Sequence, residues 1–499
     1  MPEYFIPLFV IIPLGSAFIS SLLGKKLRRI PSLLTVLTTI SLLILSIFSI
    51  IYFAGKTAVY ETGGWKLPFG IIMVLDGLTA FMLVTVGFIS ATVAIYALNY
   101  MQMYTGGWQF HTLFMLMIAG MNGVIVTGDM FNLFVFLEIA SIASYALVAF
   151  GTENEELEAS FKYVIMGSLA SLFVLLGIAL LYSYTSTLNM AHISTVLTEK
   201  GGGYVARFSV ALFALGLGLK AAIVPFHAWL PDAHPSAPAP ISAMLSGLLI
   251  KVLGVYAMIR VLFNVIGMDP VISNVLLVLG TLSMIIGVFL AVGQWDLKRL
   301  LAYHSISQVG YMILAFGLNT PLGYAGGLFH LLNHSVFKSL LFLNSGALVY
   351  SAGTRNLQEM GGFREKMPVT SNTCLVASMS ISGIPPFNGF WSKLIIIWAC
   401  IDAGRPVYAF WAVLASILTL SSFAKVQKYV FFGILKEKWS KLKEVPFAMQ
   451  FAMIALAAVC ILGGLLWIIP ELKEHFLDHA SRVLEKGKDY AGIVMRGGK

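Results

Sequence analysis

The chain has 499 residues, of which 58% are hydrophobic and only 11% are charged, and its mean hydropathy is +0.87. This composition excludes a water-soluble globular protein and predicts a polytopic membrane protein with no separate soluble domain. The formal net charge of +9 does not indicate a nucleic-acid-binding protein, because the basic residues are scattered through short loops.

Apolar windows separated by polar, Gly or Pro residues predict an all-α protein with about fourteen membrane-spanning helices. The N-terminal window lacks a basic leader and a small-residue cleavage site, so we interpret it as the first span rather than a signal peptide. The predicted spans lie near residues 2–24, 31–54, 71–100, 108–127, 130–150, 159–185, 206–228, 240–265, 271–293, 300–318, 322–350, 368–402, 408–434 and 446–470.

Basic residues gather on one side of this arrangement, at residues 25–29, 298–299, 355–366 and 436–443. Because loops rich in Lys and Arg stay in the cytoplasm, we expect this side to be cytoplasmic and both termini to lie on the outer face of the cell membrane. The last segment, residues 471–490, mixes charged with apolar residues. It predicts an amphipathic helix on the outer surface or against a partner, with a solvated tail as the alternative.

Two predicted spans are interrupted by proline, the seventh at Pro225 and the twelfth at residues 383–393, GIPPFNGFWSK. Beyond Pro225 we expect the chain to surface through Trp229, Asp232 and His234. Breaks at membrane depth need protein or a water-filled cavity around them, and two breaks five spans apart indicate an inverted five-helix repeat. The predicted divisions are 1–107 (helices 1–3), 108–265 (first repeat, helices 4–8), 271–434 (second repeat, helices 9–13) and 446–499 (helix 14 and the C-terminal tail).

Charged residues inside the apolar spans mark the candidate site, since a charge in hydrocarbon costs roughly 2.5 kcal/mol or more. A buried carboxylate persists only if it is protonated or paired, so we expect Glu138 of the fifth span to pair with Lys220 of the seventh. A helix-packing salt bridge with no transport role is the alternative. Lys251 follows Lys220 by 31 residues, which is too far for one span, so the two lysines lie on successive helices and can meet near the midplane.

The eleventh span carries His330, His334 and Lys338 at intervals of four residues, which places them in one polar stripe on a helix face. Histidine titrates near neutrality and suits a proton relay, although a lone buried histidine is more often structural. His304 of the tenth span has the same two interpretations. Lys393 of the twelfth span completes the series. A lysine whose charged partner moves can take up or release a proton, so the predicted cargo is H⁺.

Other polar residues have weaker signals. His227, Asp232, His234 and His304 are possible accessory residues. The three cysteines stand singly in apolar runs, and no iron–sulfur, flavin or nucleotide motif occurs, so we expect no metal, no cofactor and no catalytic site in this chain. Residues that could line a cation path, or could simply pack helices together, are Asp76, Asn122, Ser141, Ser144 and Asn333.

Three stretches resemble the antiporter-like subunits of respiratory complex I, Mrp-type Na⁺/H⁺ antiporters and archaeal membrane-bound hydrogenases or sulfane reductases. They are GDMFNLFVFLEI around Glu138, LKAAIVPFHAWLPDAHPSAPAPISAMLSGLLIK from Leu219, and WDLKRLLAYHSISQVGYM from Trp295. The resemblance implies fourteen helices, two inverted five-helix repeats, broken seventh and twelfth helices and a hydrated central axis. It also implies proton-pumping roles for Glu138, Lys220, Lys251 and Lys393.

Within this family, the M-type subunit of complex I usually has glutamate where this chain has Lys393. Because the sequence ends soon after the fourteenth predicted span, we expect it to lack the long lateral helix of L-type and A-type subunits. The resemblance therefore favours a D-type Mrp subunit, or its counterpart in a hydrogenase or sulfane reductase complex. Its partners would be other membrane subunits, a redox arm in the latter case, and the ions H⁺ and Na⁺. A stand-alone solute transporter and a purely structural membrane subunit are the alternatives.

Overall fold

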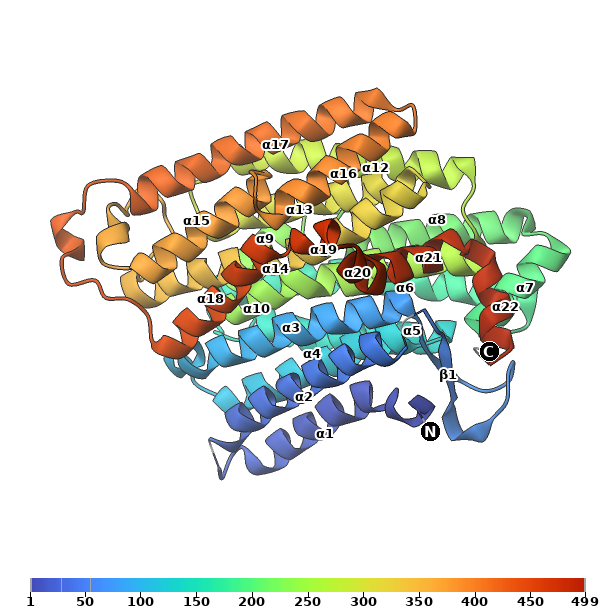
Figure 1. Cartoon of the computed structure of the whole chain (residues 1–499). Coiled ribbons are helices and arrows are strands. Elements are labelled where there is room, and N and C mark those ends of the chain that lie inside the picture. The colour runs from blue at the N-terminus through green and yellow to red at the C-terminus, as the bar shows by residue number, and fades with distance from the viewer. Residues whose placement is uncertain (1, 28, 54, 498–499) are drawn as a thin grey trace.

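The computed structural model describes residues 2–27, 29–53 and 55–497, so Arg28 of the first basic group lies outside the described part. The described part is a bundle of roughly parallel and antiparallel helices with one short hairpin (Figure 1). The predicted all-α fold is confirmed.

The helices follow one another with short connections. The long ones are α1 (Leu8–Leu23), α2 (Ile30–Tyr52), α3 (Gly77–Tyr100), α4 (Gly107–Val126), α5 (Met130–Val148), α6 (Asn154–Thr185), α8 (Gly203–Lys220), α12 (Pro270–Val292), α13 (Leu297–Gly317), α14 (Pro321–Ala352), α15 (Pro368–Ser382), α16 (Asn388–Asp402), α17 (Pro406–Val426) and α18 (Phe447–Leu462). The shorter elements are β1 (Ala58–Glu61), β2 (Ile72–Leu75), α7 (Met190–Lys200), α9 (Leu230–Ser236), α10 (Ala239–Met244), α11 (Ala257–Ile259), α19 (Leu465–Ile468), α20 (Pro470–Lys473), α21 (His479–Glu485) and α22 (Tyr490–Met495). Two π-helical segments, η4 (Leu245–Tyr256) and η5 (Arg260–Ile266), extend α10 and α11.

Aspartate side chains begin four of the long helices. Asp76, Asp129, Asp269 and Asp296 each accept a hydrogen bond from the backbone N–H three residues further on, at 2.8–2.9 Å. This cap satisfies a donor that the first helical turn leaves free. The local sequence alone therefore indicates where α3, α5, α12 and α13 begin.

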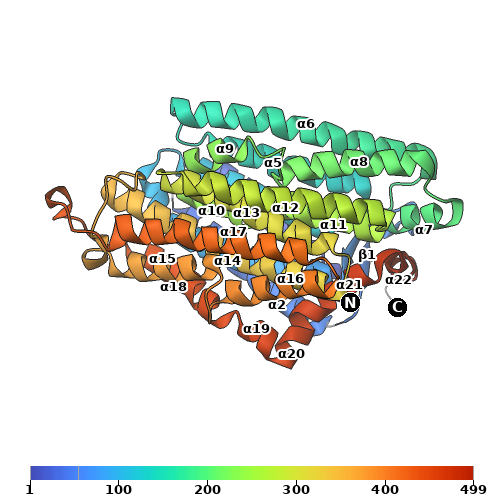
Figure 2. The ribbon, with the colours of Figure 1, turned by 90° about the horizontal axis from the view of Figure 1, so that it is seen from above.

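Eleven helices in the described part are long and apolar enough to cross a membrane. α13 and α14 are as long but more polar, and the α15–α16 span is interrupted, so the total of fourteen stays a prediction. Large apolar side chains are exposed on outer helices such as α2 and α6, as contact with lipid requires. The segment Ala239–Ile266 is buried throughout and forms the centre of the bundle. Figure 2 shows α6 and α8 on one flank and α19–α20 on the opposite one.

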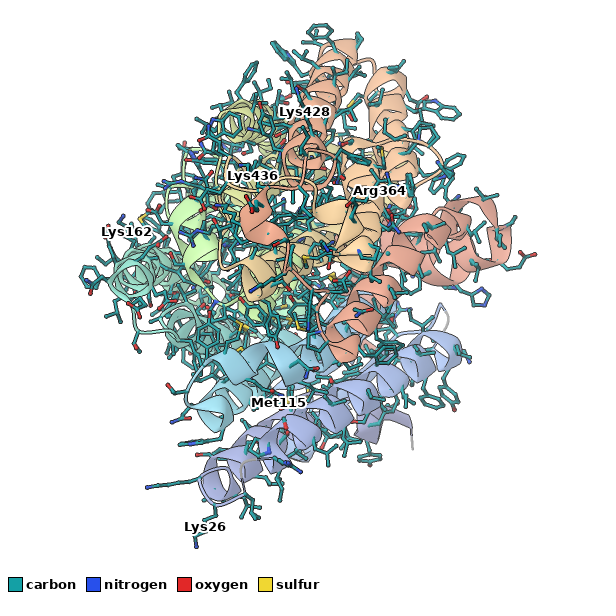
Figure 3. The ribbon with its side chains drawn as sticks, turned by 90° about the vertical axis from the view of Figure 1, so that its left-hand side faces the viewer. Lys26, Met115, Lys162, Arg364, Lys428 and Lys436 are labelled. Atoms are coloured by element: carbon teal, nitrogen blue, oxygen red, sulfur yellow. The ribbon has the colours of Figure 1, made fainter. Side chains whose placement is uncertain are left out.

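Both termini lie at the same end of the bundle, on the right in Figure 1. Figure 3 looks at the other end, where Lys26, Lys162, Arg364, Lys428 and Lys436 are seen. This arrangement agrees with an even number of spans, and it places basic residues of several distant segments together at one end.

The spacing of the elements repeats along the chain. α13 begins 167 residues after α5, α14 begins and ends 167 residues after α6, and α17 begins 167 residues after α10. Isolated antiparallel bridges join Asp129 to Asn189 and Asp296 to Asn356, again with the same offset. Two stretches of the chain thus share one order of elements, as the predicted repeat requires. The boundaries of the four predicted divisions stay a prediction.

Both predicted interruptions are present, but the first differs in detail. α8 ends at Lys220, five residues before Pro225, where Ala222 has a left-handed backbone (φ 55°) that a helix cannot continue through. The expectation that the chain then surfaces is wrong for Trp229 and His234, which are both buried. The reason is that α9 packs back against α6 and α13.

The C-terminal segments α20–α22 pack on the chain itself. Leu477 and Leu484 are buried, and Asn264 Nδ2 donates to the carbonyls of Val483 at 2.8 Å and Gly487 at 3.2 Å. α21 lies against α3 and α14. The segment is helical and amphipathic as predicted, whereas a solvated tail is wrong, because its apolar side covers this bundle. The hairpin β1–β2 and helix α7 were not predicted.

Candidate functional site

Glu138 and Lys220 form an ion pair between α5 and the end of α8. Lys220 Nζ lies 3.5 Å from Glu138 Oε1 and donates a 2.7 Å hydrogen bond to Ser141 Oγ. The hydroxyl of Ser171 on α6 donates to the same Glu138 oxygen. The lysine side chain is 3% exposed and the glutamate 27%. The single 3.5 Å contact is longer than a strong charge-assisted hydrogen bond, so a nearby change of charge can open the pair.

Lys220 is held at the break by its backbone surroundings. It is the last residue of α8, where the carbonyl end of the helix favours a positive charge. The carbonyl of Leu219 accepts a 3.0 Å hydrogen bond from Trp229 Nε1, and the N–H of Val224 donates to Ser283 Oγ of α12 at 2.8 Å. Freed backbone groups at membrane depth need such partners.

Lys251 lies in the π-helical segment η4 at the buried centre of the bundle. Its Nζ donates to the carbonyl of Ser246 in its own helix, and π-helical turns recur at functional sites. A Cβ placed on Gly254 would lie 2.4 Å from the Cα of Ala221. Because Ala221 follows Lys220, only glycine lets the segment that carries Lys251 approach the first break this closely.

The stripe on α14 is fully buried. The rings of His330 and His334 are stacked 6.3 Å apart, and His330 Nδ1 shares a 3.0 Å hydrogen bond with Ser392 Oγ of α16. Neither ring nitrogen of His334 has a protein hydrogen-bond partner, nor does Lys338 Nζ. Buried polar groups of this kind are usually satisfied by internal water. α14 packs directly against η4, and Ser339 Oγ of α14 donates a 3.2 Å hydrogen bond to the Ala243 carbonyl just before η4, so the stripe lies on a helix that adjoins the segment of Lys251.

Lys393 of α16 lies against the end of α15. Its Nζ donates to the Ile381 carbonyl at 2.7 Å and to Ser416 Oγ at 3.3 Å, and it lies 5.0 Å from the ring centroid of Tyr311. The Tyr311 and His330 rings are 5.4 Å apart. Lys393 therefore continues the α14 stripe, and like Lys220 it stands at the carbonyl end of a broken helix.

The acidic and basic members of this set are unequal in number. Within the described part, Lys220 is the only one of the four buried lysines of this set with a carboxylate, that of Glu138, within ion-pair distance. Lys251, Lys338 and Lys393 have none. The arrangement can therefore exchange protons between amines and imidazoles, but it can balance a full positive charge with a carboxylate only at Lys220.

Two of the accessory candidates, His234 and His304, are buried in the interior of the bundle, as these ionisable residues are. His234 and His304 are fully buried, and none of their ring nitrogens has a hydrogen-bond partner in the described part. The centroids of the His234 and Phe342 rings lie 5.7 Å apart. Lys338 Nζ lies 5.8 Å from the centroid of the Phe342 ring. The His304 ring lies 4.9 Å from the Phe423 ring of α17, and the adjacent Ser305 shares a 2.7 Å hydrogen bond with Ser246 of η4.

The other two accessory candidates lie elsewhere. His227 is half-buried beside the first break. Asp232 pairs with Lys162 at 3.0 Å and Arg299 at 3.2 Å, in a network at the basic end of the bundle. Nearby, the buried Lys298 donates at 2.7 Å to the carbonyl of Ala237, so it caps α9 rather than standing at the interface.

Sequence reasoning missed a second buried pair. Arg260 of η5 binds Asp76 in a bidentate manner, with Nη1–Oδ2 at 2.8 Å and Nη2–Oδ1 at 3.0 Å, and both side chains are buried. Arg260 also donates to Thr79 and Tyr256 hydroxyls. An arginine inside the apolar run of residues 253–266 carries the same signal as Lys251 and could have been found by the same criterion.

The residues considered for a cation path have packing partners. Asn122 Nδ2 donates to the Phe9 carbonyl at 2.9 Å. Asn333 Nδ2 donates to the backbone carbonyl of Asn388 at 2.9 Å, and Asn388 Nδ2 donates to Asn333 Oδ1 at 3.0 Å. Such contacts between helices favour the packing interpretation. No group of three or more His, Cys, Asp or Glu in the described residues is placed to hold a metal ion.

Comparison with known proteins gives concordant matches. A family model described as "NADH:quinone oxidoreductase/Mrp antiporter, TM" matches residues 127–419, and one described as "NADH-Ubiquinone oxidoreductase (complex I), chain 5 N-terminus" matches residues 59–111. The D subunit of the Na(+)/H(+) antiporter of Alkalihalophilus pseudofirmus is 33% identical over 461 residues, which cover 92% of this chain and 93% of that protein.

Two solved structures share the fold over nearly the whole length. A chain of the Mrp complex from Dietzia sp. DQ12-45-1b superposes with a TM-score of 0.91 at 28% identity, covering 99% of this chain and 100% of the other. A chain of the membrane-bound sulfane sulfur reductase, an archaeal respiratory membrane complex, superposes with a TM-score of 0.90 at 30% identity, covering 99% of both.

Proposed function

The chain belongs to the NADH:quinone oxidoreductase/Mrp antiporter family, and from that premise we propose that it is a D-type, proton-translocating subunit of a multisubunit membrane complex. The observation that carries the proposal is the buried line of ionisable groups. It runs from the Glu138–Lys220 pair past Lys251 and along α14 to Lys393. A line of titratable groups inside a membrane protein is a general solution for moving protons.

The mechanism rests on the loose ion pair. Two unit charges 4 Å apart interact by about 4 kcal/mol at an effective dielectric constant of 20. A proton that arrives on Lys251 therefore repels the Lys220 ammonium and weakens its contact with Glu138. Passage of the proton along the α14 histidines to Lys393 removes that repulsion, and the pair closes again.

The basic end of the bundle supports an orientation in the membrane. Lys26, Lys162, Arg364, Lys428 and Lys436 lie there (Figure 3), and cytoplasmic loops are enriched in such residues. The cytoplasm then faces this end, and both termini face the outside of the plasma membrane.

Partner subunits are supported by the exposure of Glu138. Its side chain is 27% exposed, and Ile142, one turn away on α5, is 62% exposed. A carboxylate that faced hydrocarbon would be costly, so a neighbouring membrane subunit is expected to cover the α5–α6 surface. The matched chains come from an Mrp complex and a sulfane sulfur reductase complex, which suggests siblings of those kinds, with Na⁺ as the second ion.

The test substitutes Glu138→Gln and Lys220→Gln separately in the assembled complex and measures proton movement in inverted membrane vesicles with a ΔpH-sensitive dye. Each change removes one charge of the pair, and we expect a fall of about tenfold or more. Glu158→Gln is the matched control. Glu158 is an exposed glutamate on α6 that pairs with Lys162, and its replacement should leave transport at the wild-type level.

Wild-type proton movement in both variants would overturn the paired mechanism and leave a structural role for this subunit. Solute-dependent uptake by the purified single chain in liposomes would instead support the alternative of a stand-alone transporter.

A further inference from the structure

A cavity of about 750 Å³ opens at the basic end of the bundle, between the ends of α1, α2, α3 and α4. Lys25 and Arg29 line it, and no acidic residue in the described part does so. None of the ionisable residues in the proposed proton path lines this cavity, and the proposed function assigns it no role.

The start of α4 adds hydrogen-bond donors to this cavity. Gly106, Gly107 and Trp108 line it, and the N-cap position, Gly106, offers no side chain to the free N–H groups of the first turn. α4 has 20 residues, so its N-terminus carries a full positive helix end. α1 and α3 end nearby with opposing dipoles, so the two cations decide the sign of the potential.

A buried histidine forms part of the cavity wall. His111 lines the cavity from the first turns of α4 and is only 5% exposed, and its Nδ1 has no hydrogen-bond partner in the described part of the chain. That nitrogen is covered by protein rather than open to the cavity, so an anion in the cavity meets the two cations and the first N–H groups of α4.

The surroundings identify the class of ligand. The ends of α1 and α2 next to the cavity expose large apolar side chains, among them Leu22 (78%), Leu33 (60%) and Leu37 (56%). Trp108 and Tyr104 stand at its rim, as aromatic residues do at the level of lipid headgroups. A bound molecule would have an anionic group in the cavity and acyl chains along α1 and α2.

We propose that this cavity binds the phosphate of an anionic membrane phospholipid, held by Lys25, Arg29 and the first N–H groups of α4. The lipid joins the α1–α2 pair to α3 and α4 at the cytoplasmic end. Figure 3 shows Lys26 at the edge of the bundle, where α1 connects to α2. Lys26 is next to Lys25 in sequence but does not line the cavity, so it serves as a matched control.

The experiment uses the assembled complex in nanodiscs of phosphatidylcholine, with phosphatidylglycerol titrated in. Thermal stabilisation and the lipid retained in native mass spectrometry are measured. We expect phosphatidylglycerol to bind and stabilise the wild type and Lys26→Gln alike. Each cation near the membrane surface contributes about fivefold to binding, so the double variant Lys25→Gln/Arg29→Gln should bind about twenty-five-fold more weakly.

Three results would overturn the proposal. The first is an equal loss of lipid in Lys26→Gln, which would show unspecific charge attraction. The second is saturation of the stabilisation by inorganic phosphate alone, which would identify a soluble anion as the ligand. The third is release of a membrane subunit, rather than of lipid, from the double variant.

Discussion

The two broken spans of this protein each contain a buried lysine beside the break, Lys220 before it and Lys393 after it, but balance its charge differently. Lys220 ends α8 and has the carboxylate of Glu138 at 3.5 Å. Lys393 caps α15 through the Ile381 carbonyl and lies over the Tyr311 ring, with no carboxylate in ion-pair distance in the described part. The first break therefore contains an ion pair that can open and close, whereas the second contains a cation held only by dipoles and a ring.

The difference suggests a division of labour between the repeats. The Glu138–Lys220 pair is stable in one charge state and weakened in another, so it can act as the switch. Lys393 has no counter-ion, so it can hold a proton only briefly before passing it on. The α14 stripe lies between them and offers imidazoles on one face. Three substitutions break or sharpen this comparison.

The largest effect is expected from Lys393→Gln. The amide can still donate to the Ile381 carbonyl, so the break should stay folded, but the group that accepts the proton is lost. We expect proton movement by the assembled complex to fall about tenfold or more, measured by ΔpH in inverted vesicles. Lys428→Gln, an exposed lysine in the same repeat (Figure 3), should behave as wild type. Full activity of Lys393→Gln would mean that the first repeat alone carries the protons.

The second prediction separates a structural ion pair from the proposed switch. Asp76→Asn keeps the N-cap of α3 but removes the charge that meets Arg260, and breaking a buried pair costs about 3–5 kcal/mol. We expect a lower Tm and less assembled complex, with unchanged proton movement per assembled complex. The control is Asp269→Asn, since Asp269 caps α12 at 2.8 Å without an arginine partner and Asn caps as well as Asp. Equal Tm values in the two variants would contradict a stabilising role for Asp76–Arg260.

The smallest effect should come from Ser171→Ala, which removes the hydroxyl that donates to Glu138. Loss of one hydrogen bond worth about 0.5 kcal/mol net should slow proton movement about two- to threefold, because the carboxylate is held less firmly toward Lys220. Ser209→Ala removes a serine whose hydroxyl bonds only to the Val205 carbonyl of its own helix, and it should have no effect. A tenfold loss in Ser171→Ala would place the hydroxyl in the proton path itself.

The sequence by itself determined the membrane class, most of the spans and the second break, and it pointed to the buried ionisable residues of the proposed proton path. These follow from local properties, since an apolar run long enough to span and a charge within it are both visible without a fold. The Asp caps and the four-residue spacing of the α14 stripe are equally local. Arg260 had the same visible signal, but it has a partner 184 residues away, so its role as half of a buried pair was not readable.

Only the tertiary structure decided which polar groups meet. The packing of α9 against α6 and α13 decides several of these contacts. It accompanies the early end of α8 at Lys220, it buries Trp229 and His234, and it places Asp232 in an exposed ion-pair network. The apolar side of the C-terminal segment likewise packs against α3 and α14 and does not face solvent. The physical reason is that hydrogen bonds and ion pairs are satisfied by whichever groups the packing brings within about 3 Å, and for groups far apart in the chain that choice exists only once the helices have assembled.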